Sequence, residues 1–304
     1  MRYRIRQAGF WTAGVVIAVT QIGCGSPGRV AELVEADAAV EAGAWGERVV
    51  YLDVRSADAY AAGHVNGAAS VDPAAWKSAS LDVNEGLENV AAWESRIGAA
   101  GVGNSDRVLI YDGGEMANSA RIWFILQHFG HERSSVVNGG WPAMKAQAEG
   151  GKLTLSNALS APAPRKFSAR VSSDAPVSML DRAAVREAIE SGRGRVVDAR
   201  QPSEHAGDEK HANPRGGHLP GAVNIPHTAL LTADGRLKSP EELAAIFEAA
   251  GLKKGEPLIT HCESGGRSSL EALAAVRAGY GPVKNYYRSF SDWSKDEACP
   301  VERK

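Results

Sequence analysis

The chain has 304 residues, of which 44% are hydrophobic and 23% are charged, and this balance excludes a largely disordered chain or a multi-span membrane protein. Its 34 Lys and Arg residues nearly match its 36 Asp and Glu residues, so the formal net charge is -2. Nucleic-acid binding needs a basic surface, and the composition therefore predicts no nucleic-acid partner. The length predicts about two domains.

The first 24 residues have the layout of an export signal. Arginines at positions 2, 4 and 6 precede an apolar run at 10–19, which is followed by Gly23 and Cys24. The Gly-Cys junction resembles a bacterial lipoprotein signal, in which the cysteine becomes the lipidated first residue. An uncleaved membrane anchor and a plain signal peptide remain as alternatives, although the apolar run is short for a span. We expect an exported protein, periplasmic or attached to the membrane as a lipoprotein through Cys24.

The chain contains the same sequence unit twice. Residues 49–55 read VVYLDVR and are followed by a Gly-His segment at 63–68, while residues 196–200 read VVDAR and are followed by a Gly-His segment at 217–224. A later apolar strand ends at Asp112 in the first half and at Cys262, 150 positions further on, in the second. An internal repeat of this kind predicts two domains with one fold.

Each half alternates short β-branched runs with helical patterns, which predicts an α/β class: a mostly parallel sheet with helices on both faces. One helix is expected to begin after Ser239, because Pro240 follows and Glu242 lies three residues on, as in a capping box. Residues 151–176 are rich in Gly, Ser, Ala and Pro, which favours an extended linker. We therefore predict domains at 28–150 and 177–304.

The segment from Cys262 to Ser268, CESGGRS, is the candidate for chemistry. It lies between an apolar strand and a helical pattern, so Cys262 is expected at the carboxyl end of a parallel strand, where open α/β sheets bind ligands. Gly265 and Gly266 let successive N–H groups turn inward as an anion-binding cradle. The cradle and the helix N-terminus lower a cysteine pKa, which predicts that Cys262 is a thiolate nucleophile.

The other residues of this loop are assigned to substrate binding. Arg267 supplies a fixed cation that can pair with an anionic substrate, so its expected role is binding and not proton transfer. Glu263 adds a negative charge beside it, and Ser264 and Ser268 complete the loop. A thiolate needs no adjacent base, and the residue before it, His261, should point to the opposite face of the strand as a structural residue.

The two halves resemble tandem rhodanese domains, the arrangement of thiosulfate and 3-mercaptopyruvate sulfurtransferases. The resemblance covers nearly everything after residue 28, and it rests on both Asp-x-Arg pairs, both Gly-His segments, NGGW at 138–141, the Cys262 loop and YRSFSDW at 287–293. It implies that Asp198 and Arg200 support the site. It also implies that the first domain, whose loop begins at Asp112, is catalytically inactive and helps to wall the cleft.

The resemblance further implies a two-step reaction. Cys262 attacks the outer sulfur of a small anionic donor, keeps it as a persulfide and passes it to a thiol or cyanide, with no metal or organic cofactor. We expect thiosulfate as the donor, with 3-mercaptopyruvate as the alternative. Glu263 stands where thiosulfate enzymes of this family carry a positive charge, which weakens binding of a dianion.

Two other functions are compatible with a reactive cysteine in this loop. One is a non-turnover persulfide carrier or sensor, in which Cys262 holds sulfur for a partner. The other is a phosphatase or arsenate reductase, but those enzymes resemble Cys-x5-Arg, whereas Cys262 and Arg267 form the shorter Cys-x4-Arg. The remaining thiol, Cys299, precedes Pro300 in a polar tail without a glycine cradle, and we interpret it as unpaired and incidental.

Overall fold

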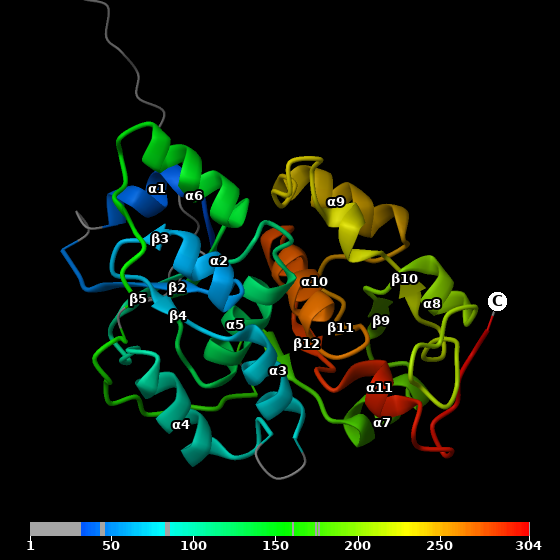
Figure 1. Cartoon of the computed structure of the whole chain (residues 1–304). Helices are drawn as coiled ribbons and strands as arrows, with labels where there is room; N and C mark the ends of the chain where they lie inside the picture. Colours follow the sequence, from blue (N-terminus) through cyan, green and yellow to red (C-terminus); the bar gives the residue numbers. More distant parts are fainter. Residues whose placement is uncertain are drawn as a thin grey trace, which may run out of the picture.

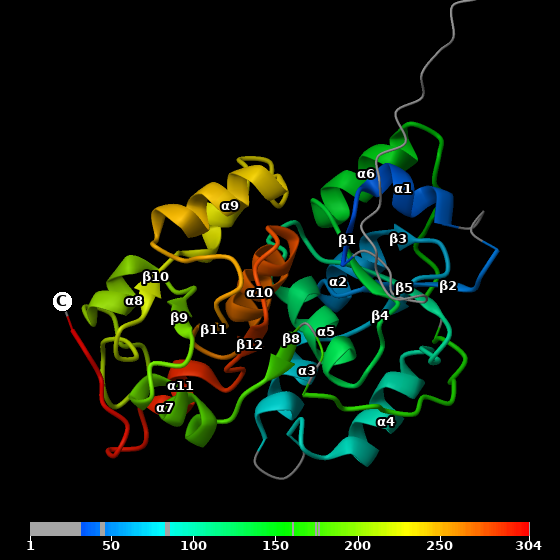
Figure 2. The same cartoon turned by 180° about the vertical axis from the view of Figure 1, so that it is seen from behind.

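The computed structural model describes residues 32–42, 46–82, 86–159, 161–173, 175 and 177–303. Within these residues the chain forms two α/β domains that lie side by side (Figures 1 and 2). The predicted export signal and Cys24 lie outside the described residues, so the structure says nothing about them. In the described ranges no helix combines the length and the apolar character that crossing a membrane requires.

The first domain is built on a parallel sheet with the strand order β1-β6-β5-β2-β4. The strands are β1 (Leu33–Val34), β2 (Val49–Asp53), β4 (Ala69–Ser70), β5 (Arg107–Tyr111) and β6 (Ser134–Val137). The helices are α1 (Ala36–Val40), α2 (Ala57–Ala62), α3 (Pro73–Leu81), α4 (Val90–Ala99), α5 (Ala117–His128) and α6 (Gly140–Glu149). Alternate strand residues point to opposite faces of the sheet. Leu52 packs on the face that α3, α4 and α5 cover, and Tyr51 packs on the face that α1, α2 and α6 cover.

The segment 151–176 contains no helix in its described part and follows the surface of the first domain. Its strand β7 (Leu155–Ser156) pairs antiparallel with β3 (His64–Val65). Further along, the side chain of Phe167 is buried in the first-domain core, and the N–H of Arg170 donates to the carbonyl of Phe129 at 3.0 Å. The described part of this segment therefore packs on the first domain along much of its length.

The second domain repeats this topology with the strand order β10-β9-β11-β12-β8. The strands are β8 (Val177–Met179), β9 (Arg195–Asp198), β10 (Val223–Asn224), β11 (Leu258–His261) and β12 (Val283–Asn285). The helices are α7 (Arg182–Glu190), α8 (Pro202–Ala206), the 3-10 helix η2 (His227–Leu230), α9 (Pro240–Ala249), α10 (Gly266–Arg277) and α11 (Ser289–Trp293). The predicted duplication and α/β class are confirmed, as is the capping box of α9, in which Glu242 accepts from the N–H of Ser239 at 2.9 Å.

The two domains meet where α5 packs against α10, near the centre of both views (Figures 1 and 2). One hydrophobic cluster runs through this junction and includes the buried faces of both helices. The ring of Phe124 from α5 stacks on that of Tyr287 with centroids 5.3 Å apart, and the Tyr287 hydroxyl lies 2.8 Å from the Ser80 hydroxyl of α3. Since the Cys262 loop runs into α10 at Gly266, the junction places that loop against the first domain.

Candidate active site

Cys262 follows β11, which lies between β9 and β12 in the second sheet. The residue therefore sits at the carboxyl edge of a central parallel strand, as the sequence predicts. Gly265 has a φ of +93°, and a Cβ at this position would lie 2.6 Å from the ring of Tyr287. Both the left-handed backbone and the contact with the ring require glycine here. The loop is thus shaped by its own glycine and by a neighbouring aromatic side chain.

The sulfur of Cys262 lies among several hydrogen-bonding groups. Its Sγ accepts a hydrogen bond from the N–H of Gly265 at 3.1 Å and lies 3.6 Å from Ser268 Oγ and 3.7 Å from Ser289 Oγ. Ser289 Oγ also accepts from the backbone N–H of Cys262 at 3.0 Å. Ser289 has a φ of 58°, unusual for a residue with a side chain, and such strain is common at functional sites. The segment 287–293 supported the family resemblance, but its sequence did not single out Ser289.

The environment of Cys262 favours its thiolate. Burial by itself raises the pKa of the thiol, but the charge of Arg267, the Ser268 hydroxyl and the backbone N–H groups of Ser268 and Ser264 outweigh it, and the pKa is lowered. The start of α10 at Gly266 adds the positive end of a helix dipole. The direction of the shift is the one expected from the loop sequence, and it increases the fraction of Cys262 that is present as the nucleophilic thiolate.

Arg267 is held by a carboxylate that the sequence did not single out. Its Nη1 and Nη2 donate to the two carboxylate oxygens of Glu204 at 2.6 and 2.8 Å, a bidentate ion pair. Glu204 and the Cys262 thiolate keep the pKa of Arg267 above its usual value, although burial lowers it. The equivalent positions of α5 and α2 are Asn118 and Ala59, so this ion pair is found in the second domain alone.

Cys262 lies in a cavity of about 480 Å³ formed by both domains. The first domain contributes Lys77, Ala117, Asn118 and Arg121. The second domain contributes Gln201, Glu204, Glu209, His211, Cys262, Glu263, Ser264, Gly266 and Arg267. Acidic and basic side chains both line the cavity, so its wall is not uniformly basic. It can still hold an anion, because basic side chains face part of the space. The cavity is large enough for a small donor, and Cys262 is 1% exposed within it.

One wall of this cavity comes from a segment that the first domain lacks. Asp-x-Arg and Gly-His are separated by 17 positions in the second half, from Arg200 to Gly217, and by 8 in the first, from Arg55 to Gly63. Within the longer segment, Asn213 Nδ2 donates to both carboxylate oxygens of Glu263 at 3.0 and 3.1 Å. The negative charge of Glu263 is therefore fixed at the cavity wall, which bears directly on anion binding.

Asp198 ends β9, the strand that pairs with β11, and Arg200 follows two residues later. Arg200 Nη2 donates to Asp198 Oδ2 at 2.7 Å and to the carbonyl of Gly217 at 2.8 Å. In the first domain Arg55 makes the same pair of contacts, with Asp53 and with the carbonyl of Gly63. Neither member of the Asp198–Arg200 pair lines the cavity. Because the arrangement is repeated in the first domain, which has no cysteine, we interpret it as a support that connects the strand end to the Gly-His segment.

Two buried titratable side chains, His261 and Glu271, belong to the strand before the Cys262 loop and to the helix after it. Burial lowers the pKa of His261 to about 4 against the opposing effect of Asp198, so the imidazole is neutral, and His261 does not line the cavity. Glu271 of α10 is fully buried, and neither of its carboxyl oxygens has a hydrogen-bond partner among the residues that the structure describes. Burial, followed by the negative charges of Asp198 and Cys262, raises the pKa of Glu271 well above 4.5. The protonated, uncharged form of Glu271 is therefore favoured by its surroundings.

In the first domain Asp112 occupies the place of Cys262. Its Oδ1 accepts from the N–H groups of Gly114 at 2.9 Å and Met116 at 3.1 Å, and its Oδ2 accepts from the N–H and hydroxyl of Ser119, both at 3.0 Å. The cradle is thus filled by a fixed carboxylate. Four residues separate Asp112 from α5, whereas three separate Cys262 from α10, so the longer loop surrounds the larger anion.

Cys299, the third cysteine, does not line the cavity. Cys299 is a free thiol that is 1% exposed, and it packs in the core of the second domain beside Tyr286 and Trp293. Burial, followed by the charge of Asp296, raises the pKa of its thiol, in contrast to the lowered pKa of Cys262. Among the described residues no group of three or more His, Cys, Asp and Glu side chains is placed to hold a metal ion.

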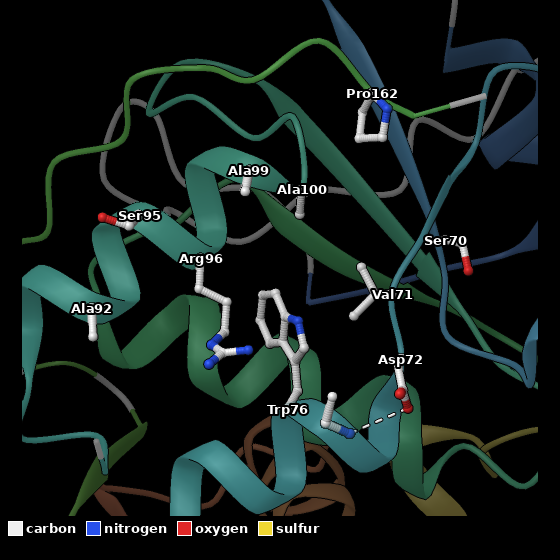
Figure 3. Close-up of a pocket in the computed structure, with 11 residues that line it drawn as sticks. Ser70, Val71, Asp72, Trp76, Ala92, Ser95, Arg96, Ala99, Ala100 and Pro162 are labelled. Carbon is white, nitrogen blue, oxygen red and sulfur yellow. Dashed lines mark hydrogen bonds between the residues drawn. The ribbon is translucent and has the colours of Figure 1, made fainter. Parts of the chain in front are cut away.

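A second cavity, of about 510 Å³, lies within the first domain, where Trp76 and Arg96 face the segment after β4 (Figure 3). On that segment the carboxylate of Asp72 accepts from the N–H groups of Ala74 and Ala75 and so caps α3. None of the residues that line this cavity belongs to the Cys262 loop, and none is a cysteine. The cysteine chemistry is therefore assigned to the cavity between the domains.

The site thus combines a duplicated parallel sheet with a cysteine of lowered pKa at the carboxyl edge of one copy. The family model described as the rhodanese-like domain matches residues 35–147 and 181–296. The chain is 32% identical to the thiosulfate sulfurtransferase of Pseudomonas aeruginosa, over 84% of this chain and 91% of that protein. It is 33% identical to the 3-mercaptopyruvate sulfurtransferase of Homo sapiens, over 76% of each.

Solved structures show the same fold. The Escherichia coli 3-mercaptopyruvate sulfotransferase SseA superposes with a TM-score of 0.71 and 25% identity, over 86% of this chain and 99% of that one. Wild-type EanB gives a TM-score of 0.77 with 20% identity, over 90% of this chain and 69% of that one. The chain therefore belongs to the tandem-domain rhodanese family, and it is an enzyme of the sulfurtransferase class.

The buried acid Glu271 makes stability depend on pH. In the unfolded chain its carboxyl ionises near pH 4.5, whereas in the folded chain its pKa is raised, so folding above that pH takes up a proton. Its favourable contribution is complete below the unfolded pKa and is lost as pH rises towards the folded pKa. Relative to Glu271→Gln, we expect wild-type unfolding free energy to fall by about 1.4 kcal/mol per pH unit in this window.

Urea denaturation of both proteins between about pH 5 and about pH 8 measures this difference. Gln has the shape of the protonated acid and does not ionise, so it isolates the cost of the proton from the cost of burying a polar group. A difference in unfolding free energy that stays constant over this range would show that Glu271 is not protonated on folding.

Proposed function

We propose that the enzyme moves a sulfane sulfur from a small anionic donor to a thiol or cyanide through a persulfide on Cys262. The observation that carries this proposal is the hydrogen bond of 3.1 Å from the N–H of Gly265 to Cys262 Sγ, in a cavity reached by both domains. The inward N–H groups of the loop can stabilise the thiolate and also the terminal sulfur of a persulfide, which carries the negative charge about 2 Å beyond Sγ.

The two half-reactions balance without an outside oxidant or reductant. In the first, the Cys262 thiolate attacks the outer sulfur of thiosulfate, a new S–S bond forms, the S–S bond of the donor breaks, and sulfite leaves with its electron pair. In the second, a cyanide or thiolate lone pair attacks the terminal persulfide sulfur, and the Cys262 thiolate is released. The side chain thus serves as nucleophile and then as leaving group.

We take thiosulfate as the donor and 3-mercaptopyruvate as the second candidate. Both compounds appear in the names of relatives, and the Pseudomonas aeruginosa relative named for thiosulfate is covered over 91% of its length. On the cavity wall, Lys77 of α3 and Arg121 of α5 offer positive charge to an anion, whereas Glu263 opposes it. The balance of these charges is the physical basis of donor preference.

Cys262→Ser tests the nucleophile. We expect loss of thiocyanate formation from thiosulfate and cyanide, because a serine hydroxyl has neither the low pKa nor the nucleophilicity of the thiolate. Cys299→Ser is the matched control, since Cys299 is a buried thiol outside the cavity, and its activity should stay near that of wild type.

The same assay separates the alternatives. Multiple turnovers per enzyme are expected, whereas a single turnover would identify a persulfide carrier. Substantial activity in Cys262→Ser would contradict the persulfide mechanism. Faster turnover of a phosphate ester than of either sulfur donor would identify a phosphatase, a result opposed by the short Cys262 loop and by the longer loop that surrounds the Asp112 carboxylate.

Glu263→Gln tests the donor. Removing this charge from the cavity wall should lower the KM for thiosulfate more than the KM for 3-mercaptopyruvate, because thiosulfate carries two negative charges and mercaptopyruvate one. By Coulomb's law the change in binding free energy should be about twice as large for the dianion. Gln keeps an oxygen that can accept from Asn213. Equal changes in both KM values, measured by steady-state kinetics on one preparation, would rule out a role of Glu263 in donor choice.

We also propose that the protein is exported and that Cys24 is its lipidated first residue, on the basis of the basic and apolar pattern before the Gly23-Cys24 junction. Mass spectrometry of the mature protein should find an amino terminus at Cys24 with a lipid attached. Cys24→Ala should then move the protein from the membrane fraction to the soluble one. An intact terminus at Met1, or a mature terminus elsewhere without lipid, would contradict this part of the proposal.

A further inference from the structure

We propose that Arg121 of the first domain is a positioning residue for the nucleophile of the second. By binding the carbonyl of the Ser264–Gly265 peptide, it turns the N–H of that same peptide towards Cys262 Sγ. The inference rests on the proposed role of Cys262 as the nucleophile. It gives the domain without a cysteine a part in setting the reactivity of the sulfur, in addition to walling the cavity.

A single peptide unit connects the two domains to the sulfur. Arg121 Nη1 donates to the carbonyl of Ser264 at 2.7 Å. The N–H of the same peptide belongs to Gly265 and donates to Cys262 Sγ at 3.1 Å. A trans peptide is planar, and its C=O and N–H point in opposite directions. An interaction that fixes the carbonyl on the side of the first domain therefore also aims the N–H at the sulfur.

The loop sequence does not fix this orientation by itself. Gly265 has a φ of +93°, and glycine reaches backbone conformations of either hand at little cost. The peptide before it can therefore rotate if nothing holds its carbonyl. A guanidinium donor stabilises a neutral carbonyl more strongly than a neutral donor does. Arg121 supplies this stabilisation from 143 positions away in the sequence.

Arg121 is itself held rigidly. The side chain is 5% exposed on α5, and its Nη1 also donates to the hydroxyl of Tyr287 at 2.8 Å. Tyr287 is fixed by the Ser80 hydroxyl and by stacking on Phe124. A Cβ added to Gly266 would lie 2.7 Å from Arg121 Nη2, so glycine at the start of α10 is what lets the guanidinium approach.

The first domain supplies an arginine to the loop of the second domain, and the equivalent helix position of the second domain supplies none to the first. Arg121 is the fifth residue of α5, and the fifth residue of α10 is Leu270, which is buried and apolar. The loop of the first domain has no such need, because the carboxylate of Asp112 accepts several hydrogen bonds within its own loop. The domain that carries the sulfur is the one whose loop is held from outside.

The test measures the pKa of the Cys262 thiol in the full chain, from the pH dependence of its alkylation by iodoacetamide. Arg121→Met should raise this pKa by about one unit, so that alkylation below the pKa slows about tenfold. Arg121→Met also removes a positive charge, which could raise the pKa without any change of orientation. Gly266→Ala separates the two effects, since it keeps every charge and displaces the guanidinium.

We expect Gly266→Ala to slow alkylation in the wild-type background and to have little further effect in the Arg121→Met background. Such non-additivity is the signature of two substitutions that act on one contact. A shift with Arg121→Met but none with Gly266→Ala would assign the effect to charge alone and overturn the proposal. Additive shifts, or no shift in either variant, would overturn it as well.

Glu88→Gln is the matched control for a loosened domain junction. Glu88 of the first domain accepts from Arg288 Nη2 at 3.1 Å and is not among the residues that line the cavity of Cys262. Its substitution should leave the pKa of Cys262 unchanged, and a shift equal to that of Arg121→Met would assign the effect to general loosening. The result is independent of the proposed function, because alkylation needs no sulfur donor. If Cys262→Ser kept full activity while Arg121→Met moved the pKa, the function would fail and the positioning role would stand.

Discussion

The hydrogen bond from the Gly265 N–H to Cys262 Sγ depends on three parts of the structure at once. The central strand β11 delivers the cysteine to the edge of the sheet, and the start of α10 delivers the N–H. Gly265 adopts a left-handed conformation that fits beside the ring of Tyr287. A buried thiol would ordinarily have a raised pKa, so the lowered pKa of Cys262 depends on the charge of Arg267 and on the hydrogen-bond donors of its own loop.

The duplicated fold provides an internal comparison for this site. In the first domain the carboxylate of Asp112 occupies the cradle and accepts its hydrogen bonds. This anion is part of the chain, so it cannot be exchanged. In the second domain a single sulfur occupies a shorter loop, beside a cavity where a further sulfur can be accommodated. The features specific to the second half are the Glu204–Arg267 ion pair and the segment that carries Asn213. These additions, and not the fold itself, distinguish the reactive copy.

The domain junction links stability with chemistry. The hydrophobic cluster around α5 and α10 is continuous across both domains, and the side chains at its edge, Arg121 and Tyr287, reach the loop of the nucleophile. The same helix α10 carries Glu271, an acid with no hydrogen-bond partner in the described part of the chain, and burial raises its pKa because it makes the charged form unfavourable. A neutral Glu271 avoids placing a second negative charge near the thiolate.

Sequence alone determined the features that are local along the chain. Strand-helix alternation, the repeated segments and the Cys262-to-Arg267 spacing predict the α/β duplication and the reactive loop, because backbone conformation and glycine freedom act between near neighbours. Only the tertiary structure showed that Arg121 and Glu204 reach this loop. It also showed that Glu271, a residue type that is usually exposed, is buried in α10. Those facts come from helix packing between segments far apart in sequence, where no periodicity or spacing records which side chains will meet.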